Sequence, residues 1–236
     1  MRTCIVFLAV LAASIAVAQT TPERLYDVKT YGVFRDMMLQ GDFTPKIRLA
    51  DAMAQWPTTG VGALADARGE ITITDGKLVV SYGKPGDHPS PDSESAALLA
   101  MGRAADWHTV DIDNDVPPQE VERYIGDAAR ARGIPAETSF PFELRGVVVG
   151  YVMHVNAEPT DGPHGMGLPM AVTGETSGDE LSGKVAGLYV SADLMGVATH
   201  GGERIHAHWV SDDDTATAHL DRWGIKAGST LLLPAN

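Results

Sequence analysis

Cysteine is almost absent from this sequence: Cys4 is the single one among 236 residues. A disulfide needs two cysteines, so an exported protein of this sequence must be held together by its core or by a metal. Basic residues are also scarce, since 18 Lys and Arg stand against 31 Asp and Glu, for a net charge of −13. Without a basic stripe, the chain is not expected to bind nucleic acid or anionic membrane surfaces.

Long apolar runs are limited to Ile5–Ala18, which is too short to cross a bilayer comfortably. Arg2 precedes this run, and it ends in small residues before the polar Gln19. This pattern is typical of a secretory signal peptide. We expect residues 1–18 to be removed and the protein to be exported to the periplasm or outside the cell, with no membrane association after cleavage. A buried N-terminal helix is the weaker alternative, because nothing polar interrupts the run.

Hydrophobic periodicity and turn residues predict an α+β fold. Asp75-Gly76 between two β-rich runs is the strongest hairpin signal, and prolines at 117–118 with Gly133 bound a helix. We expect a mixed-sheet N-terminal half (19–139) packed on a mostly antiparallel β C-terminal half (140–236) that carries a metal site. The predicted helices are 27–43, 48–56 and 117–133, and the predicted strands lie in 69–83, 106–113, 142–157, 181–194, 204–210 and 229–234.

Three of the eight histidines lie within 203–220, "ERIHAHWVSDDDTATAHL". Residues i and i+2 of a strand share a face, so His206 and His208 project together. If "SDDDTAT" is a hairpin turn that sets His208 opposite His219, the third imidazole joins that face. Three imidazoles from two paired strands leave one side of a metal open, as a catalytic zinc requires.

The alternative is three surface histidines on a polar hairpin, since a bare H-x-H pair is common. The position within a strand-like run, beside a carboxylate-rich turn, favours the metal. Four other histidines are not expected to bind this metal: His88, His108, His164 and His200.

Two blocks, "GALADARGEITITDGKLVVSYG" (62–83) and "SGKVAGLYVS…IHAHWVSDDDTATAHLDRWGI" (182–225), resemble the α-acetolactate decarboxylase family. The specific part is the H-x-H-x10-H spacing with an intervening Ser-Asp-Asp. The resemblance implies a two-domain α/β fold with the metal in the C-terminal domain. It also implies a zinc enzyme that removes CO2 from 2-acetolactate to give acetoin.

Carried over by position, the resemblance makes His206, His208 and His219 the zinc ligands and Glu70 the acidic residue at the metal. Without the resemblance, Glu70 is a solvent-facing carboxylate at the end of a strand. The family's active-site arginine falls on His154 when its glycine is aligned with Gly146. Arg145 and Arg204 are nearby cations that could supply the missing charge, and a second family glutamate near the C-terminus has no counterpart before "TLLLPAN".

The sequence is therefore compatible with three functions. The first is zinc-dependent decarboxylation of a small 2-hydroxy-3-keto acid, with Glu70, His154 and Arg145 as catalytic candidates. The second is an exported zinc-containing binding protein of the same fold that has lost turnover. The third is a zinc hydrolase with Glu70 as its base. The sequence leaves the oligomeric state open, with a homodimer as one option.

Overall fold

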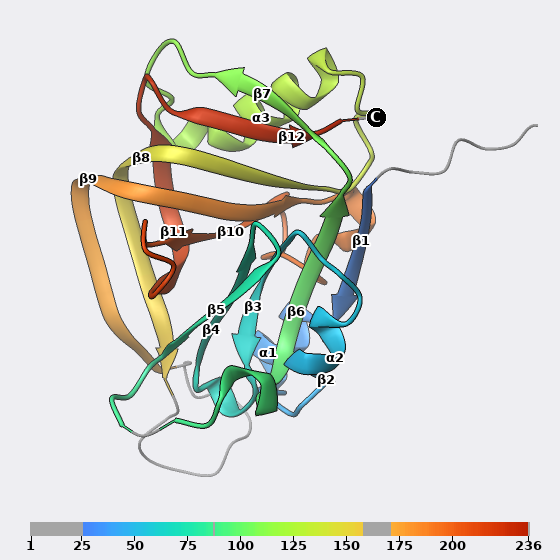
Figure 1. Cartoon of the computed structure of the whole chain (residues 1–236), viewed down its shortest axis with the longest axis vertical. Coiled ribbons are helices and arrows are strands. Elements are labelled where there is room, and N and C mark those ends of the chain that lie inside the picture. Colours follow the sequence, from blue (N-terminus) through green and yellow to red (C-terminus); the bar gives the residue numbers. More distant parts are fainter. Residues whose placement is uncertain (1–25, 87, 158–170, 236) are drawn as a thin grey trace, which may run out of the picture.

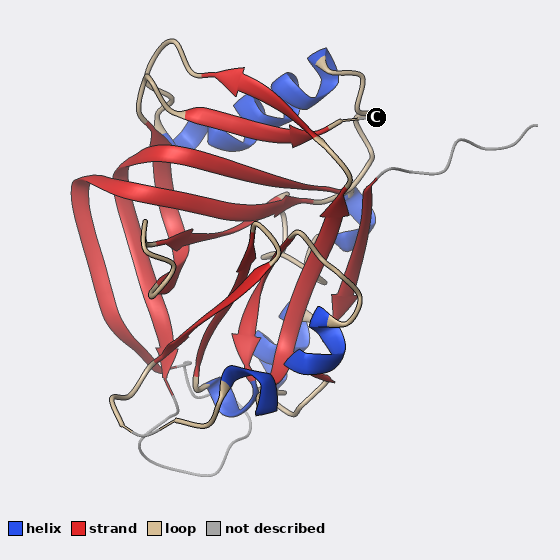
Figure 2. Ribbon diagram, viewed as in Figure 1, coloured by secondary structure: helices blue, strands red, loops and turns tan. Residues whose placement is uncertain are grey.

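Two six-stranded sheets form the body of the protein, and helices lie at their margins (Figures 1 and 2). The computed structural model describes residues 26–86, 88–157 and 171–235. The expected signal peptide, its cleavage point and His164 lie outside these residues. Together with the helices, the two sheets confirm the α+β class. All strand pairings among the described residues are antiparallel, so the expectation of a mixed sheet in the N-terminal half is wrong.

The first sheet is built from residues before position 105 and has the order β1-β6-β3-β4-β5, with β2 pairing on β6. β4 and β5 form the predicted hairpin, whose turn residues Asp75 and Gly76 have φ of 50° and 72°. Both values are positive, as the tightest hairpin turns require. The strands are β1 (Tyr26–Tyr31), β2 (Ile47–Arg48), β3 (Thr59–Leu64), β4 (Gly69–Thr74), β5 (Lys77–Tyr82) and β6 (Ser95–Ala104).

The second sheet follows the order β11-β10-β9-β8-β12-β7, and β11 also pairs with β8. The four strands from β8 to β11 therefore close a ring of hydrogen-bonded neighbours. Such closure holds each strand against two others and fixes the register of the histidine hairpin. The strands are β7 (Trp107–Asp111), β8 (Phe140–Ala157), β9 (Ala171–Tyr189), β10 (Ile205–Val210), β11 (Thr217–Ile225) and β12 (Thr230–Pro234).

The helices are short: α1 (Phe34–Gln40), α2 (Leu49–Met53) and α3 (Val121–Ala131). None of them, within the described part of the chain, is long and apolar enough to cross a membrane. The helix predicted over 27–43 is wrong in its first half, which is β1. Gly32, at φ 80°, separates strand from helix, and a Cβ there would lie 2.1 Å from the Ala97 carbonyl oxygen. Pairing with β6 thus overrides the local helical pattern.

β3 and β6 have no counterpart among the predicted elements. All six residues of β3 are buried, and β6 is buried along most of its length. Both strands are covered on two faces, so they lack the alternation of polar and apolar residues that reveals a half-exposed strand. The alanines and leucines of β6 also favour helices by intrinsic propensity.

The sheets meet along a seam that contains both apolar and polar contacts. Val61 and Ala100 of the first sheet pack against Leu188 of β9 and against Val190, which follows that strand. Glu143 on β8 accepts hydrogen bonds from the Thr59 hydroxyl and the Asp75 amide, each at 3.0 Å. The strands up to β6 belong to the first sheet and those from β7 onward to the second. The change from one sheet to the other therefore comes before the domain boundary expected at 139/140. The domain assignment itself stays a prediction.

Candidate metal centre

The hairpin of β10 and β11 brings three imidazoles together. His208 lies directly opposite His219, so the predicted register is confirmed. His206 shares the face of His208, and the three rings have centroids 5.0–5.2 Å apart. One nitrogen from each ring lies within 4.8 Å of the other two. All three side chains are buried, and together they can bind a metal ion.

A chain of hydrogen bonds decides which nitrogen of His208 carries its proton. The Thr217 hydroxyl donates to the Trp209 carbonyl, so it accepts from the Thr72 hydroxyl. Thr72 therefore has its oxygen free to accept from Nδ1–H of His208, 3.0 Å away. Nε2 of His208 is left with a lone pair that faces the other histidines. Threonines from both sheets thus set the tautomer of one imidazole.

His206 is held in the same tautomer by a backbone group. Its Nδ1–H donates to the Ala198 carbonyl at 2.8 Å, which leaves Nε2 free. Nε2 of His208 lies 3.3 Å from Nε2 of His206 and also 3.3 Å from Nδ1 of His219. Zinc–nitrogen bonds of about 2.0–2.1 Å in a tetrahedron separate two ligand nitrogens by about 3.3–3.4 Å. Two of the three separations between donor atoms therefore match those in a tetrahedral metal site, and the third is within 4.8 Å.

Burial keeps these imidazoles neutral, which is the form that binds a metal. Burial lowers the pKa of His206 to about 4 and the pKa values of His208 and His219 well below the usual range. The neighbouring histidines lower the pKa values further. At neutral pH the three rings therefore offer lone pairs rather than charges.

Glu70 reaches the histidines from the other sheet. It lies at the start of β4, its side chain is buried, and its Oε1 accepts the Asn156 amide hydrogen bond at 2.9 Å. Its Oε2 lies 3.7 Å from Nε2 of His208. Burial raises the pKa of Glu70 to about 7, although the charge of His154 opposes this rise. A carboxyl group with this pKa can carry a proton, and beside a bound cation it can also act as an oxygen ligand.

His154 lies on β8 directly opposite His219, and their ring centroids are 4.9 Å apart. Its Nδ1–H donates to the Asp221 carboxylate at 2.6 Å. Burial alone would lower the pKa of His154, but the hydrogen bond and charge of Asp221 and the charge of Glu70 raise it above its usual value. His154, which the sequence resemblance aligns with the family arginine, is therefore an imidazole whose pKa lies above its usual value.

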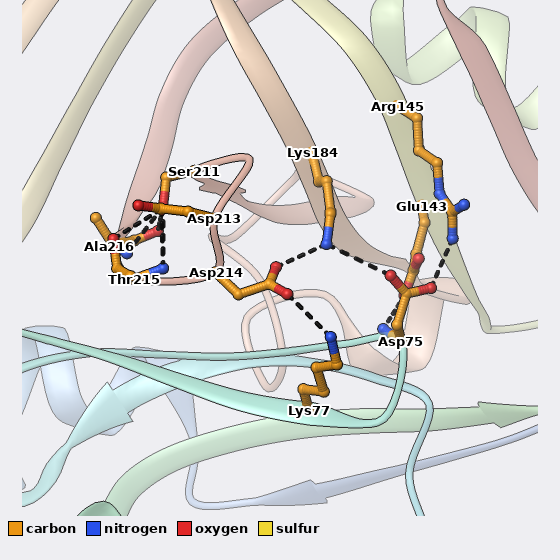
Figure 3. A network of polar contacts seen from close by, with 10 residues as sticks. All are labelled: Asp75, Lys77, Glu143, Arg145, Lys184, Ser211, Asp213, Asp214, Thr215 and Ala216. Atoms are coloured by element: carbon orange, nitrogen blue, oxygen red, sulfur yellow. Dashed lines mark hydrogen bonds and ion pairs between the residues drawn. The ribbon is translucent and has the colours of Figure 1, made fainter.

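Arg145 does not reach the histidines. It lies nine residues before His154 on β8, which at about 3.3 Å per residue is up to about 30 Å away. Its guanidinium pairs with Asp75 at 2.6 Å in a polar network that joins the β4–β5 turn to the second sheet (Figure 3). Arg204 is also occupied elsewhere, since it pairs with Glu137 at 3.0 Å. Neither arginine is among the described residues that line the cavity at the histidines.

A cavity of about 520 Å³ opens onto the histidines. One wall is apolar and comes from α1, β3 and β6, and the other carries the titratable groups. No lysine or arginine is among the described residues that line it. The lining residues are Phe34, Met37, Met38, Gly62, Ala63, Glu70, Leu98, Val152, His154, Asn156, Glu175, His200, His206, His219 and Asp221.

Several residues of this site were not singled out from the sequence. Thr72, Asn156 and Asp221 each lie two positions after a predicted site residue on the same strand. The alternation of strand faces was therefore a signal that could have found Thr72 and Asn156, whereas Asp221 lies in a bulge where regular alternation does not hold. His200 lines the cavity with its ring 4.2 Å from that of Phe34, but it is not part of the three-histidine cluster. His88 and His108 are likewise outside the cluster.

Comparison with known proteins identifies the fold that carries this three-histidine cluster. No protein-family model and no curated protein matches the sequence. Solved structures do match. Acetolactate decarboxylase from Bacillus subtilis subspecies spizizenii superposes with a TM-score of 0.68 at 14% identity, covering 89% of this chain and 86% of that one. The chain has the α-acetolactate decarboxylase fold.

Two further structures with the acetolactate decarboxylase fold agree. The α-acetolactate decarboxylase of Bacillus subtilis strain 168 has a TM-score of 0.67 at 13% identity, with 89% of this chain and 86% of that chain covered. A Staphylococcus aureus protein of unknown function, described as similar to α-acetolactate decarboxylase, has a TM-score of 0.64 at 12% identity, with 87% and 84% covered. The sequence resemblance is limited to two blocks, but the similarity in fold covers most of the chain.

Proposed function

We propose that the protein is a zinc-dependent decarboxylase of 2-acetolactate, or of a related 2-hydroxy-3-keto acid, that forms acetoin or the corresponding product. One observation carries the proposal. Glu70 of the first sheet lies 3.7 Å from the three-histidine cluster of the second, in a chain with the acetolactate decarboxylase fold.

Loss of CO2 from a β-keto acid breaks a C–C bond, moves its electron pair toward the ketone oxygen and consumes one proton at carbon. A zinc ion held by His206, His208 and His219 would supply Lewis acidity at that oxygen. Glu70, with its raised pKa, carries the proton that the carbon takes up. The apolar wall of the cavity limits water around the reacting carbon.

The substrate carboxylate needs a cationic or hydrogen-bonding partner to orient it. The described cavity lining contains no lysine or arginine, and His154 is the lining imidazole whose pKa is raised. We assign it the task of holding the carboxylate. A guanidinium is always charged, whereas an imidazole is charged only when it is protonated. The affinity for the substrate carboxylate should therefore increase as the pH falls below the pKa of His154.

Acetoin formation tests this function directly. Purified protein is incubated with racemic acetolactate, and acetoin is measured by its colour reaction, with and without a chelator. We expect stereoselective formation of acetoin that stops with chelator and returns with added Zn2+. If acetoin never exceeds the non-enzymatic rate although zinc is bound, the decarboxylase assignment falls and the binding protein takes its place. Chelator-sensitive cleavage of esters without acetoin formation would point to the hydrolase.

Export is a separate proposal that rests on residues 1–18. Expression of the whole chain in a Gram-negative host, followed by mass spectrometry of the exported protein, should give Gln19 as the first residue. Full-length protein retained in the cytoplasm would contradict it.

A further inference from the structure

Asp221 is a carboxylate in the cavity lining to which the catalytic proposal gives no task. Its Oδ2 accepts the Nδ1–H hydrogen bond of His154 at 2.6 Å, and its Oδ1 lies 4.0 Å from Nε2 of His219. The second distance is too long for a hydrogen bond, so the carboxylate only lies near this nitrogen of the neutral ring. One carboxylate thus faces both the histidine at the position of the family arginine and one member of the metal cluster.

The backbone is irregular where this carboxylate is placed. His219 pairs with His154 and Leu220 with Met153, but the next pair is Arg222 with Val152. Asp221 is therefore an extra residue on β11 with no partner on β8. Such bulges disrupt the hydrogen-bond ladder, and they occur preferentially next to active sites, where they redirect a side chain.

A second irregularity faces the same histidine from its other neighbour. On β9, Thr176 pairs with Met153 and Thr173 with Val155, so two residues of β9 stand against His154. One of the two is Glu175, which lines the cavity. Regular pairing is therefore interrupted on β9 opposite His154, and on β11 at Asp221, two residues after the partner of His154.

We infer that Asp221 is a positioning residue that orients His154 toward the cavity and selects the tautomer of His219 that faces the metal. By accepting Nδ1–H, it leaves Nε2 as the nitrogen through which His154, which also interacts with the Asn156 side chain, can contact a molecule in the cavity. By standing beside Nε2 of His219, it favours a proton on that atom and a lone pair on Nδ1. Nδ1 is the atom that lies 3.3 Å from His208. Carboxylates behind metal-binding histidines act in this way.

The inference rests on the proposed zinc site, and three variants test it. Asp221→Ala removes the acceptor, Asp221→Asn keeps an oxygen that can accept from His154, and Asp212→Asn removes a charge from an exposed position on the same hairpin. The first readout is nitrogen-15 NMR of the histidine rings in metal-free protein. We expect the Nδ1 proton of His154 to be protected in the wild type and in Asp212→Asn, and to exchange freely in Asp221→Ala.

The second readout is zinc affinity by competition with a chromophoric chelator, together with the visible spectrum of the Co2+ form. Loss of a residue behind a ligand lowers metal affinity by about 10- to 100-fold. We expect a loss in this range and a changed Co2+ spectrum for Asp221→Ala, with Asp221→Asn intermediate. In turnover, Asp221→Ala should raise KM as well as lower kcat, because His154 is released.

The inference is overturned if Asp221→Ala matches the control variant Asp212→Asn in all three measurements: the His154 proton signal, the zinc affinity and the Co2+ spectrum. The same holds if it only lowers the unfolding midpoint. Neither the NMR nor the metal measurement uses a substrate. A wild type that makes no acetoin therefore counts against the proposed function, while these two readouts still decide the role of Asp221.

Discussion

Two buried glutamates show how position decides what a residue can do. Glu70 and Glu143 are each 1% exposed, and burial raises the pKa of both, to about 7 and about 6. Glu70 faces the histidines, whereas Glu143 accepts hydrogen bonds from Thr59 and the Asp75 amide at the seam between the sheets. A buried glutamate can thus act in catalysis beside the histidines, as proposed for Glu70, or join the two sheets by hydrogen bonds, as Glu143 does.

We predict that Glu70→Gln lowers turnover of acetolactate by roughly 10²-fold or more while bound zinc stays stoichiometric. The amide keeps the shape of the side chain but cannot carry the proton. Glu143→Gln makes the same change in a buried residue outside the cavity and should leave turnover near that of the wild type. Equal turnover in the two variants would assign Glu70 a structural role.

Glu143 also predicts a dependence of stability on pH. Its pKa is raised from 4.5 to about 6 on folding, so the folded state holds the proton more tightly than the unfolded chain. This contribution to stability is complete below pH 4.5 and is lost as the pH rises to about 6. Relative to the wild type, Glu143→Gln should gain about 2 kcal/mol in free energy of unfolding between pH 4 and pH 7.

Urea unfolding of both proteins at each pH, with chelator present, measures this difference. Glu180→Gln is the control, because that carboxylate is exposed. A constant difference between the wild type and Glu143→Gln across this range would contradict the assignment.

At the scale of elements, the β4–β5 hairpin is tied to the second sheet by its turn. Asp75 contacts Arg145 at 2.6 Å and Lys184 at 3.5 Å, and Lys184 reaches Asp214 in the β10–β11 turn at 2.6 Å (Figure 3). The turn conformation therefore matters for how Glu70, on the same hairpin, meets the histidines.

Gly76 permits that turn, because its φ of 72° is strained for any residue with a Cβ. We predict that Gly76→Ala lowers the free energy of unfolding by about 1 kcal/mol. Gly201→Ala is the matched control, since a Cβ there would meet nothing within 4 Å and its φ is not in the left-handed region. Thermal unfolding of the two variants gives the comparison. Equal stability would show that the turn tolerates a side chain.

At the scale of the whole molecule, the candidate metal centre lies where the two sheets pack. His206, His208 and His219 come from the second sheet, while Glu70 and Thr72 reach them from the first. A metal bound there stabilises the folded chain because the unfolded chain does not offer this site.

We predict that a chelator lowers the melting temperature of zinc-loaded protein by about 10 °C. Zinc at about 1,000 times its Kd contributes about 4 kcal/mol, and 1 kcal/mol shifts Tm by about 2–4 °C at this size. The His206→Ala/His208→Ala double variant should contain no stoichiometric zinc and show no chelator effect. Zinc retained by that variant in elemental analysis would place the metal elsewhere.

The sequence by itself determined what depends on neighbours along the chain. The Asp75-Gly76 turn and the helix after the prolines follow from local turn and capping signals, and strand alternation places His206 and His208 on one face. The register of His208 against His219 was only one option from the sequence, and the closed ring of strands fixes it. Tertiary structure alone decided the rest. β1 is a strand because it pairs with β6, and Arg145 is excluded from the cavity because it lies at the other end of β8. Asp221 reaches His154 through a bulge. Each depends on contacts between residues far apart in sequence, whose geometry no local pattern specifies.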